Sequence, residues 1–447
     1  MCRQTQIFII ITFVASLLSA CGGGSSTNNT GVRPSDSVLL ESQIVNSSSW
    51  EPGIAVDPNG NGFAIWYHQD ANMVDNYIYV RRYMAGGGWG AAVTLAHLIT
   101  ANPSEKSLGC PAIGVDGAGN AIATWCEWDG SRYNVQAKRY IAGTGWQVTA
   151  SMVSSGTESA FPQRTAVAAN GDAIVIWSQS NGLWSNRFTL TNNWGLAPQQ
   201  LDATGDTNQK PDLAIDANGN AIVLWTNGAG LQTKYYDAST GWDNNPTVIQ
   251  ADTGATYSPH VRFDGSGNAL AMWLQDGDTS AAVRLDITLN HYNVSTHSWD
   301  TAQHFPALNG GTSISSTTYI KHTVDASGNA LVIWYDNSTG VYQLKANQYL
   351  GGTSWGTTVT LSHAGYGDIA VDAAGNGIAV WLCDDPNVGT VCSNRFSPAN
   401  GWGTMAAHNT EYTVYDGTIE PVLASNAAGN AFVVWTELKR MAAYRFP

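Results

Sequence analysis

The chain has little charge, and most of that charge is negative. Charged residues make up 12% of the 447 residues, and 20 Lys and Arg stand against 34 Asp and Glu, which gives a formal net charge of −14 at pH 7. Nucleic acids and anionic membrane surfaces are bound through clusters of basic side chains. The shortage of such side chains argues against both kinds of partner, and we predict no nucleic-acid binding.

Long apolar runs are scarce as well. The one clear run extends from Ile7 to Leu18 and follows the positive residue Arg3. It is too short to cross a membrane comfortably, which takes about 20 apolar residues. A short apolar segment behind a positive residue is typical of an export signal. We therefore predict a signal peptide over residues 1–20.

The end of this segment resembles a lipoprotein processing site. Leu18-Ser-Ala-Cys21 is similar to the lipobox of bacterial lipoproteins. The resemblance implies cleavage before Cys21, a lipid on Cys21 and, because Gly22 rather than Asp follows, sorting to the bacterial outer membrane. An ordinary secretory signal with a chance cysteine is the alternative. Residues 21–37 are rich in Gly, Ser, Thr and Asn and are predicted to form a flexible tether, so that the lipid is the only contact with the membrane.

Four cysteines remain beyond the signal and Cys21, which fits export to an oxidising compartment. Cys110 and Cys126 flank one copy of the repeat described below, and Cys383 and Cys392 bracket a single loop. We predict two local disulfides, Cys110–Cys126 and Cys383–Cys392. Zinc binding is the alternative, but neither pair has a partnering His or Cys at the spacing of a zinc finger, so no metal site is predicted.

What the sequence does have is a repeat. An apolar run, a short polar turn and a second apolar run ending in Trp recur eight times, and the segment from Lys210 to Trp225 is the clearest copy. The turn is Asp-x-x-Gly-Asn in six copies, whereas the third copy has Ala168 and the eighth has Asn426 in place of the Asp. Intervals of roughly 50 residues are the period of propellers and arrays. The repeat tryptophans are Trp66, Trp125, Trp177, Trp225, Trp273, Trp334, Trp381 and Trp435.

Each repeat predicts a blade of four short strands, A to D. Strand B, such as residues 173–177, is apolar at every position and not alternating, so both of its faces are expected to be buried between neighbouring blades. Strand C ends in an aromatic residue, and a Gly-rich turn leads to a second Trp and then to strand D. In the A–B turn, Asp accepts hydrogen bonds from turn N–H groups while Gly and Asn tolerate positive φ.

The ends of the chain predict how the ring closes. The second Trp occurs seven times, and Pro447 follows directly after the C strand of the eighth repeat. The segment from Val38 to Leu40 has the Val-x-Leu spacing of the D strands. We predict that it completes the last blade and removes exposed sheet edges. The predicted fold is all-β: an eight-bladed β-propeller over residues 38–447, with an open β-solenoid as the alternative.

The most regular residues are expected to be structural. A Trp at one position in every blade predicts packing between blades, with its indole N–H bonded to a backbone carbonyl. Asp57-Pro-Asn-Gly-Asn61-Gly62 matches the start of a calcium loop, but His68 stands at the twelfth position, where a bidentate Glu is required. No cofactor is predicted, and calcium is the one possibility that the sequence leaves open.

Candidate binding residues lie where the repeat breaks. The B–C and D–A connections share one face of a propeller and are long and irregular here, and variable loops on a rigid scaffold usually carry binding residues. Trp50, Trp128 and Trp184 fall outside the repeat and are predicted on this loop face, where they would stack on sugar rings or an apolar partner. His68, Tyr77 and His97 are candidates on the same face. The alternative for each Trp is that it plugs its own loop.

The chain resembles secreted bacterial β-propellers with Asp-box or BNR-type repeats, a group that includes sialidases and many non-catalytic surface proteins. The likeness is one of repeat style, since two residues separate Asp and Gly in Asp216–Gly219 and Trp lies further on. No sialidase arginine triad or Tyr/Glu nucleophile pair carries over. The sequence also looks like uncharacterised bacterial lipoproteins of this repeat style.

Two hypotheses on function follow. The first is a monomeric, lipid-anchored, non-catalytic binding or scaffold protein that recognises a glycan or a protein through its loop face. The second is a carbohydrate-active enzyme, a polysaccharide lyase or glycosidase, with its site at the channel mouth. The acid, base and nucleophile of a propeller site come from different blades, so spacing along the sequence does not exclude an enzyme.

Overall fold

The computed structural model describes residues 37–41, 48–100, 107–195, 197–204, 211–250, 255–276, 285–305, 319–336, 341, 343–351, 354–363, 366–383, 391–408, 421–437 and 439–447. The predicted signal peptide, the lipidation site Cys21 and nearly all of the predicted tether lie outside these residues. Structural statements below concern the described residues. No helix among them is long and apolar enough to cross a membrane.

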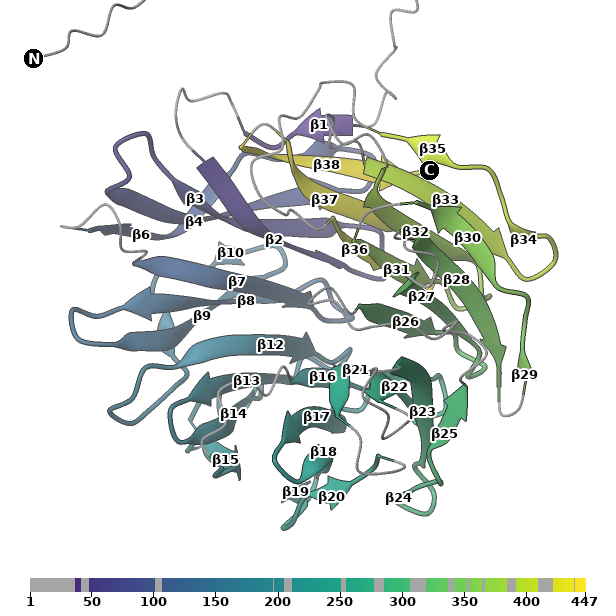
Figure 1. The fold of residues 1–447 in the computed structure, drawn as a ribbon. Coiled ribbons are helices and arrows are strands. Elements are labelled where there is room, and N and C mark those ends of the chain that lie inside the picture. Colours follow the sequence, from purple (N-terminus) through teal and green to yellow (C-terminus); the bar gives the residue numbers. More distant parts are fainter. Residues whose placement is uncertain are drawn as a thin grey trace, which may run out of the picture. The chain divides into compact units, whose positions relative to one another are not determined.

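The described chain forms eight antiparallel sheets (Figure 1). Their innermost strands are β2, β7, β12, β16, β21, β26, β31 and β36. Each of these strands contacts the next one in this order, and β36 contacts β2. This circular set of contacts closes a ring, so the predicted eight-bladed propeller is confirmed and the open solenoid is excluded.

Blades one to four run from the inside outwards. Their strands are β2 Ser48–Val56, β3 Gly62–Gln69, β4 Asp75–Met84, β5 Gly88–Trp89 and β6 Val93–Ile99; β7 Leu108–Val115, β8 Ala121–Trp128, β9 Tyr133–Ile141, β10 Gly145–Trp146 and β11 Ser151–Met152; β12 Phe161–Val167, β13 Ala173–Gln179, β14 Gly182–Phe188 and β15 Gln199–Asp202; and β16 Asp212–Ile215, β17 Ala221–Asn227, β18 Gly230–Asp237, β19 Gly241–Trp242 and β20 Thr247–Val248.

Blades five to eight repeat this order. Their strands are β21 Thr256–Phe263, β22 Ala269–Asp276, β23 Leu285–Asn293, β24 Ser298–Trp299 and β25 Gln303–Phe305; β26 Ile320–Val324, β27 Ala330–Asp336, β28 Gln343–Leu350, β29 Ser354–Trp355 and β30 Val359–Ser362; β31 Gly367–Val371, β32 Gly377–Leu382, β33 Val391–Ser397, β34 Gly401–Trp402 and β35 Ala406–Ala407; and β36 Val422–Ser425, β37 Ala431–Glu437, β38 Arg440–Phe446 and β1 Ser37–Leu39.

The outer strand of most blades differs from the prediction. In six blades it is split: a two-residue strand with the second Trp pairs with the end of strand C, and a separate piece pairs further along strand C. In blade one, Trp89 of β5 pairs with Tyr83, and β6 pairs with Asp75 to Val80. The second Trp is therefore held in the sheet and does not lie in a free turn.

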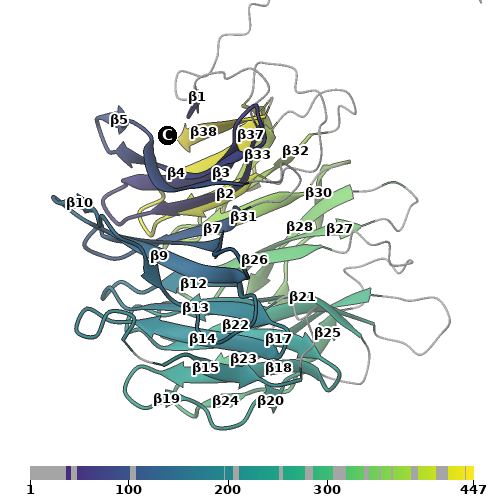
Figure 2. The same ribbon diagram turned by 90° about the vertical axis from the view of Figure 1, so that its left-hand side faces the viewer.

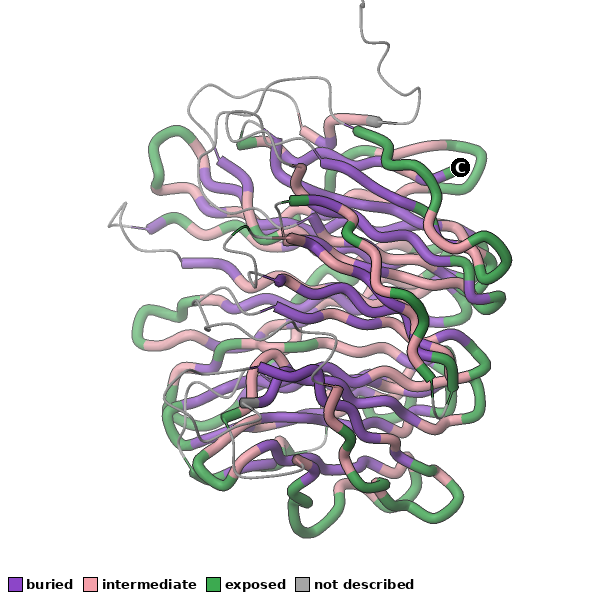
Figure 3. Tube along the Cα trace, turned by 45° about the vertical axis from the view of Figure 1, so that its right-hand side comes forward, coloured by how far each residue is buried: buried purple, intermediate pink, exposed green. Residues whose placement is uncertain are grey.

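Strand B is buried on both faces, as its unbroken apolar sequence predicts. All seven residues of β13 are buried, and all eight repeat tryptophans are at most 1% exposed. Figure 3 shows the buried strands ending in exposed turns at the surface. Removing so much apolar surface from water is the main favourable term in folding, and here it acts between neighbouring blades.

The A–B turns have the predicted chemistry. Asp216 Oδ1 accepts hydrogen bonds from the backbone N–H of Asn218 at 2.8 Å and of Asn220 at 2.9 Å, and its Oδ2 accepts one from the Asn220 amide at 2.8 Å. Gly219 lies at a φ of 90°, a conformation that favours glycine. Asp57 uses its carboxylate in the same way, on Asn59 and Asn61, so its oxygens are engaged by the turn.

The predicted bond from each repeat indole to a backbone carbonyl is wrong. Trp125 donates to the Glu127 carboxylate and Trp273 donates to the Gln275 amide oxygen, each two residues further along its strand. Trp66 donates to Glu41. Within the described part of the chain, the other five indole N–H groups have no hydrogen-bond partner. These tryptophans are placed by packing alone, because strand B directs them between blades where backbone carbonyls are already paired within each sheet.

The ring closes through β1, as predicted. Ser37, Val38 and Leu39 pair with Tyr444, Ala443 and Ala442 of β38, and Figure 2 shows the first and last strands side by side. The next residue continues the pairing, because Leu40 N–H donates to the Met441 carbonyl at 2.8 Å.

Glu41 then fixes the end of the closing strand. Its carboxylate accepts hydrogen bonds from the Ser49 hydroxyl at 2.7 and 2.8 Å, from the Trp66 indole and from the Met441 N–H at 3.3 Å. Ser49 and Trp66 are fully buried. The Glu41 side chain thus connects the segment after β1 with blades one and eight. We call Glu41 and the groups around its carboxylate the clamp.

We predict that Glu41→Ala lowers the free energy of unfolding by about 3 kcal/mol, because buried donors left without an acceptor cost about 1–3 kcal/mol each. Urea denaturation measures the change. Glu41→Gln keeps one carbonyl acceptor and is expected to lose less. Asp300→Ala, at an exposed residue directly after β24 of blade five, is the control, and a Glu41→Ala midpoint equal to that of the control would show that the clamp is dispensable.

Candidate functional site

Three aromatic rings of blade one form a stack at the loop-face end of its outer strands. Tyr77 and Tyr79 lie two residues apart on β4 with ring centroids 5.2 Å apart and planes 6° apart. His97 of β6 stacks on Tyr77 at 4.3 Å and 3°. Its side chain is 40% exposed. We call Tyr77, Tyr79 and His97 the blade-one ring group.

A carboxylate holds one end of this group. Asp75 Oδ1 lies 2.6 Å from His97 Nε2 and fixes the orientation of the imidazole. Burial, together with the negative charges of Asp75 and Asp70, raises the pKa of Tyr77. The surface around the ring group is therefore electronegative, a property that disfavours anionic ligands.

His68 touches the ring group from behind but belongs to the clamp. Its ring lies 5.9 Å from that of Tyr77, and its Nδ1 lies 2.8 Å from Ser49 Oγ and 3.5 Å from Glu41 Oε1. A serine, a histidine and a carboxylate are the components of a nucleophilic triad. Here the serine bridges the other two, and Ser49 and His68 are at most 4% exposed. A substrate has no access to this set in this conformation.

The three extra tryptophans each pack on their own blade. Trp50 stacks on Tyr67 at 5.6 Å with 17° between the planes. Trp128, which is 36% exposed, lies 5.2 Å from Tyr133, and the Trp184 indole donates to the Asn181 side chain at 2.9 Å. Of the six predicted binding residues, the structure brings His68, Tyr77 and His97 together and leaves the tryptophans as separate positions on blades one, two and three.

A charged ring in the inner strands was not foreseen from the sequence. In five consecutive blades a polar residue of strand A pairs with the residue just before the repeat Trp. Aligning the eight repeats on that Trp would have revealed the position, which is small or apolar in blades eight, one and two. The polar residues are Arg164, Asp212, His260, Lys321 and Asp368.

These residues connect neighbouring blades. Asp212 Oδ1 lies 2.9 Å from Arg164 Nε, and its Oδ2 lies 2.7 Å from Arg262 Nη1. Lys321 Nζ lies 3.4 Å from Asp368 Oδ1. The carboxylates also accept backbone N–H groups of the next blade, at Val261 and Leu423. The arrangement joins the inner strands electrostatically where they approach one another.

Burial and neighbouring charges shift the pKa values of the ionisable side chains at these inner strands. Burial alone would raise the pKa of Asp212, but the charges of Arg262 and Arg164 and a hydrogen bond from His260 outweigh it and hold that pKa well below its usual value. Burial lowers the pKa of His260 and, more strongly, that of His322. His322 ring nitrogen Nε2 lies 3.1 Å from the Leu270 carbonyl. The two histidines are therefore held neutral at pH 7.

The cysteines behave differently in the two pairs. Cys383 and Cys392 form the predicted disulfide. Cys110 and Cys126 are thiols with sulfur atoms 2.9 Å apart, longer than the roughly 2.05 Å of an S–S bond, so the second predicted disulfide is not formed in this structure. The physical reason is a bulge in β7: Cys110 has a φ of 54°, and Gly109 is the residue that pairs with Cys126.

Metal ligands do not gather among the described residues, where no group of three or more His, Cys, Asp or Glu is placed to hold an ion. One motif of hydrolases does occur in the sequence, Gly-x-Ser-x-Gly at residues 352–356. Its Ser354 lies in the two-residue strand β29 beside Trp355. That position is an outer hairpin, and not the strand–turn–helix context in which this motif presents a nucleophile.

Comparison with known proteins gives no identity. No family model matches the sequence, and no curated protein sequence does. Solved structures that match include the polysaccharide lyase Uly1, with a TM-score of 0.46 and 10% identity over 89% of each chain. A protein of unknown function from Dyadobacter fermentans has a TM-score of 0.40 and 11% identity, covering 80% of this chain and 96% of that one.

The leech intramolecular trans-sialidase also matches, with a TM-score of 0.39 and 9% identity over 86% of this chain and 82% of the leech chain. Similarities this weak carry no argument about activity or ligand.

The neutral buried histidines predict a loss of stability in mild acid. Burial first, and the charge of Arg395 second, lower the pKa of His408 to about 4, and the unfolded chain takes up the proton near 6.5. A group with a depressed folded pKa of this kind contributes stability above pH 6.5 that is lost progressively as the pH falls towards 4. Asp212 also contributes only above its unfolded value, which lies near 3.9, so it does not affect this window.

We expect His408 to make the free energy of unfolding fall between pH 6.5 and 5 by up to about 1.4 kcal/mol per pH unit. His408→Gln is expected to reduce the slope by that amount in urea titrations at several pH values. His297→Gln, on an exposed turn, is the matched control. An unchanged slope in His408→Gln would contradict the assignment.

Proposed function

We propose that this protein is a lipid-anchored, non-catalytic binding protein of the bacterial cell envelope that recognises an uncharged glycan through the blade-one ring group. The observation that carries the proposal is the parallel stack of Tyr79, Tyr77 and His97, with its outermost ring exposed. One face of a pyranose ring presents C–H groups, which pack on an aromatic face with its negative quadrupole. The rings stand on two paired strands and are held rigidly, so little entropy is lost on binding.

Charge supports an uncharged ligand. Asp75 and Asp70 lie beside the rings, and the whole chain has a formal charge of −14. A carboxylate accepts hydrogen bonds from sugar hydroxyl groups but repels uronic and sialic acids. Neutral hexose polymers therefore fit this surface better than acidic ones.

The internal hydrogen bonds of Ser49, His68 and Glu41 support the non-catalytic part of the proposal. Ser49, His68 and Glu41 hold the closing strand in place, and their hydrogen bonds are made to one another inside the protein. The location is supported by the sequence alone, through Leu18-Ser-Ala-Cys21 and its likeness to a lipobox. These residues lie outside the described part of the chain.

The test is a screen of the wild-type protein on neutral and acidic glycans, followed by calorimetry with the best neutral ligand. We expect Tyr77→Ala and His97→Ala each to weaken binding roughly ten-fold, because an aromatic stacking contact is worth about 0.5–1.5 kcal/mol. Trp184→Ala is the control, because it removes an aromatic side chain of another blade.

Other outcomes reject parts of the proposal. Loss of binding in Trp128→Ala but not in Tyr77→Ala would move the site to blade two. Binding to acidic glycans only would contradict the charge argument. Products detected by mass spectrometry with the wild type and absent with His97→Ala would show that the protein is an enzyme, and capture of a protein partner with no glycan bound would replace the ligand class.

A further inference from the structure

One repeated feature covers the junctions between blades. The second Trp of each blade, here called the hairpin tryptophan, shares a hydrophobic cluster with the second residue of strand B in the preceding blade. Trp146 lies 6.1 Å from Phe63, and Trp89 lies 5.9 Å from Phe432. The seven pairs are Trp89 with Phe432, Trp146 with Phe63, Trp194 with Ile122, Trp242 with Ile174, Trp299 with Ile222, Trp355 with Leu270 and Trp402 with Leu331.

The junction between blades seven and eight differs from the other seven. The residue to be covered there is Ile378, and its cluster contains no hairpin tryptophan. In blade one, Tyr83 at the end of strand C pairs with Trp89. The corresponding residue of blade eight is Phe446, and β1 pairs with β38 only at Ala442 to Tyr444. At Phe446, β38 pairs with Ala431 of β37, and no second strand among the described residues pairs with it there.

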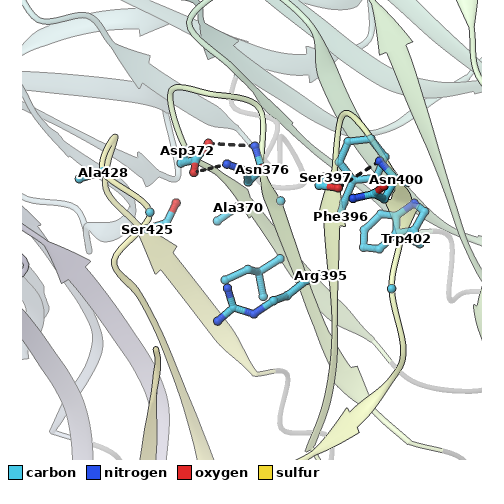
Figure 4. Close-up of a pocket in the computed structure, with 15 residues that line it drawn as sticks. Ala370, Asp372, Asn376, Arg395, Phe396, Ser397, Asn400, Trp402, Ser425 and Ala428 are labelled. Carbon is cyan, nitrogen blue, oxygen red and sulfur yellow. Dashed lines mark hydrogen bonds between the residues drawn. The ribbon is translucent and has the colours of Figure 1, made fainter.

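A cavity lies at this junction. Its volume is about 500 Å³, and it is lined by the strands and turns of blade seven and by the A–B turn of blade eight. Figure 4 shows Arg395 and Phe396 of β33, Trp402 of β34, and Ser425 at the end of β36 around it. This volume lies within the range of about 300–1,000 Å³ that is usual for ligand pockets.

Side chains at this junction are more exposed than their counterparts at the other seven. Ile378 is 7% exposed, whereas the seven residues at the same position in the other blades are at most 3% exposed. Arg395, which pairs with Ile378 across the sheet, is exposed, whereas Arg82, Arg139, Arg187 and Arg445 at the same position are only partly exposed. Both differences follow if the group that packs over this position elsewhere is absent.

Arg395, which lines the cavity, also contacts the end of β38. Its Nη2 donates to the Pro447 carbonyl at 2.9 Å, and its guanidinium lies 5.7 Å from the Phe446 ring. In blade three, by contrast, Arg187 is bonded to Asp172, to the Tyr236 hydroxyl and to the Ala238 carbonyl. The cavity thus borders the end of β38. At the equivalent position of blade one, the Gly-Trp strand β5 pairs with strand C.

We propose that this cavity binds an extended peptide segment that carries a tryptophan. The segment would pair with β38 beside Phe446, as a strand added to a sheet edge, and its indole would lie over Ile378 and Phe396. The chemistry of the occupant is read from the other seven junctions, each of which is filled by a tryptophan of this chain. The site lies on the short-turn face, at a junction other than the one that holds the blade-one ring group, and does not depend on glycan binding.

The probe is the peptide acetyl-Ala-Asn-Gly-Trp-Gly-Thr-amide, which copies residues 399–404 of this chain. Calorimetry with the full-length protein is expected to show saturable binding. The same peptide with Ala in place of Trp is expected to bind more weakly by roughly ten-fold or more, because the packed indole supplies most of the contact. Equal binding of the two peptides would overturn the proposal.

A second measurement uses a variant that fills its own cavity. Replacing Pro447 by the blade-seven sequence Ser-Pro-Ala-Asn-Gly-Trp-Gly-Thr, which follows Phe396 at residues 397–404, supplies a hairpin tryptophan to blade eight. We expect it to abolish peptide binding and to raise the midpoint of thermal unfolding by about 2 °C or more.

The matched control is the same extension with Ala in place of Trp, which is expected to do neither. Tyr77→Ala is expected to keep full peptide binding, which separates this site from the proposed glycan site. If both extensions behave alike, or if Tyr77→Ala loses the peptide, the cavity is not the peptide site.

Discussion

The eight sheets remain a ring because residues from both ends of the described chain share one sheet. β1 supplies three residue pairs to β38, and Glu41 then binds donors from blades one and eight. Every strand B is buried on both faces only if each blade has a neighbour on either side. An open array would expose the outer faces of two blades, so the burial of the whole core depends on this closure.

Closure of the ring by β1 also makes the junction between blades seven and eight unlike the other seven. β1 replaces the longer piece of an outer strand but brings no hairpin tryptophan, so Ile378 and Arg395 are less covered than their counterparts. On the opposite side of blade eight, the clamp around Glu41 packs behind Tyr77 and Tyr79. The two candidate sites therefore lie on the two blades next to blade eight, where regular packing gives way to the closing strand.

The fold could be predicted because its signals are local and repeated. Asp216 and Gly219 specify a turn within five residues, and the same turn recurs in five other blades. A prediction made for one copy can therefore be checked against the others. The Val38–Leu40 spacing matched known D strands. The indole partners could not be predicted in this way, since Trp66 bonds to Glu41 twenty-five residues earlier and nothing near Trp66 in sequence indicates it. Asp212 likewise meets Arg164 and Arg262 about 50 residues away in either direction.

The two candidate sites were revealed by comparing the contacts and burial of equivalent residues in different blades, and not by residues that are extra in the sequence. The tryptophans outside the pattern, Trp50 and Trp184, drew notice in the sequence because they are extra, yet each packs against its own blade. The cavity at Ile378 lies at the one junction whose described hydrophobic cluster contains no hairpin tryptophan, and this difference is visible only when all eight copies are aligned and their burial is compared. In a repeat protein the regular copies serve as the reference for the irregular one. Seven junctions hold a hairpin tryptophan, and an indole is therefore the group expected to fit at the eighth.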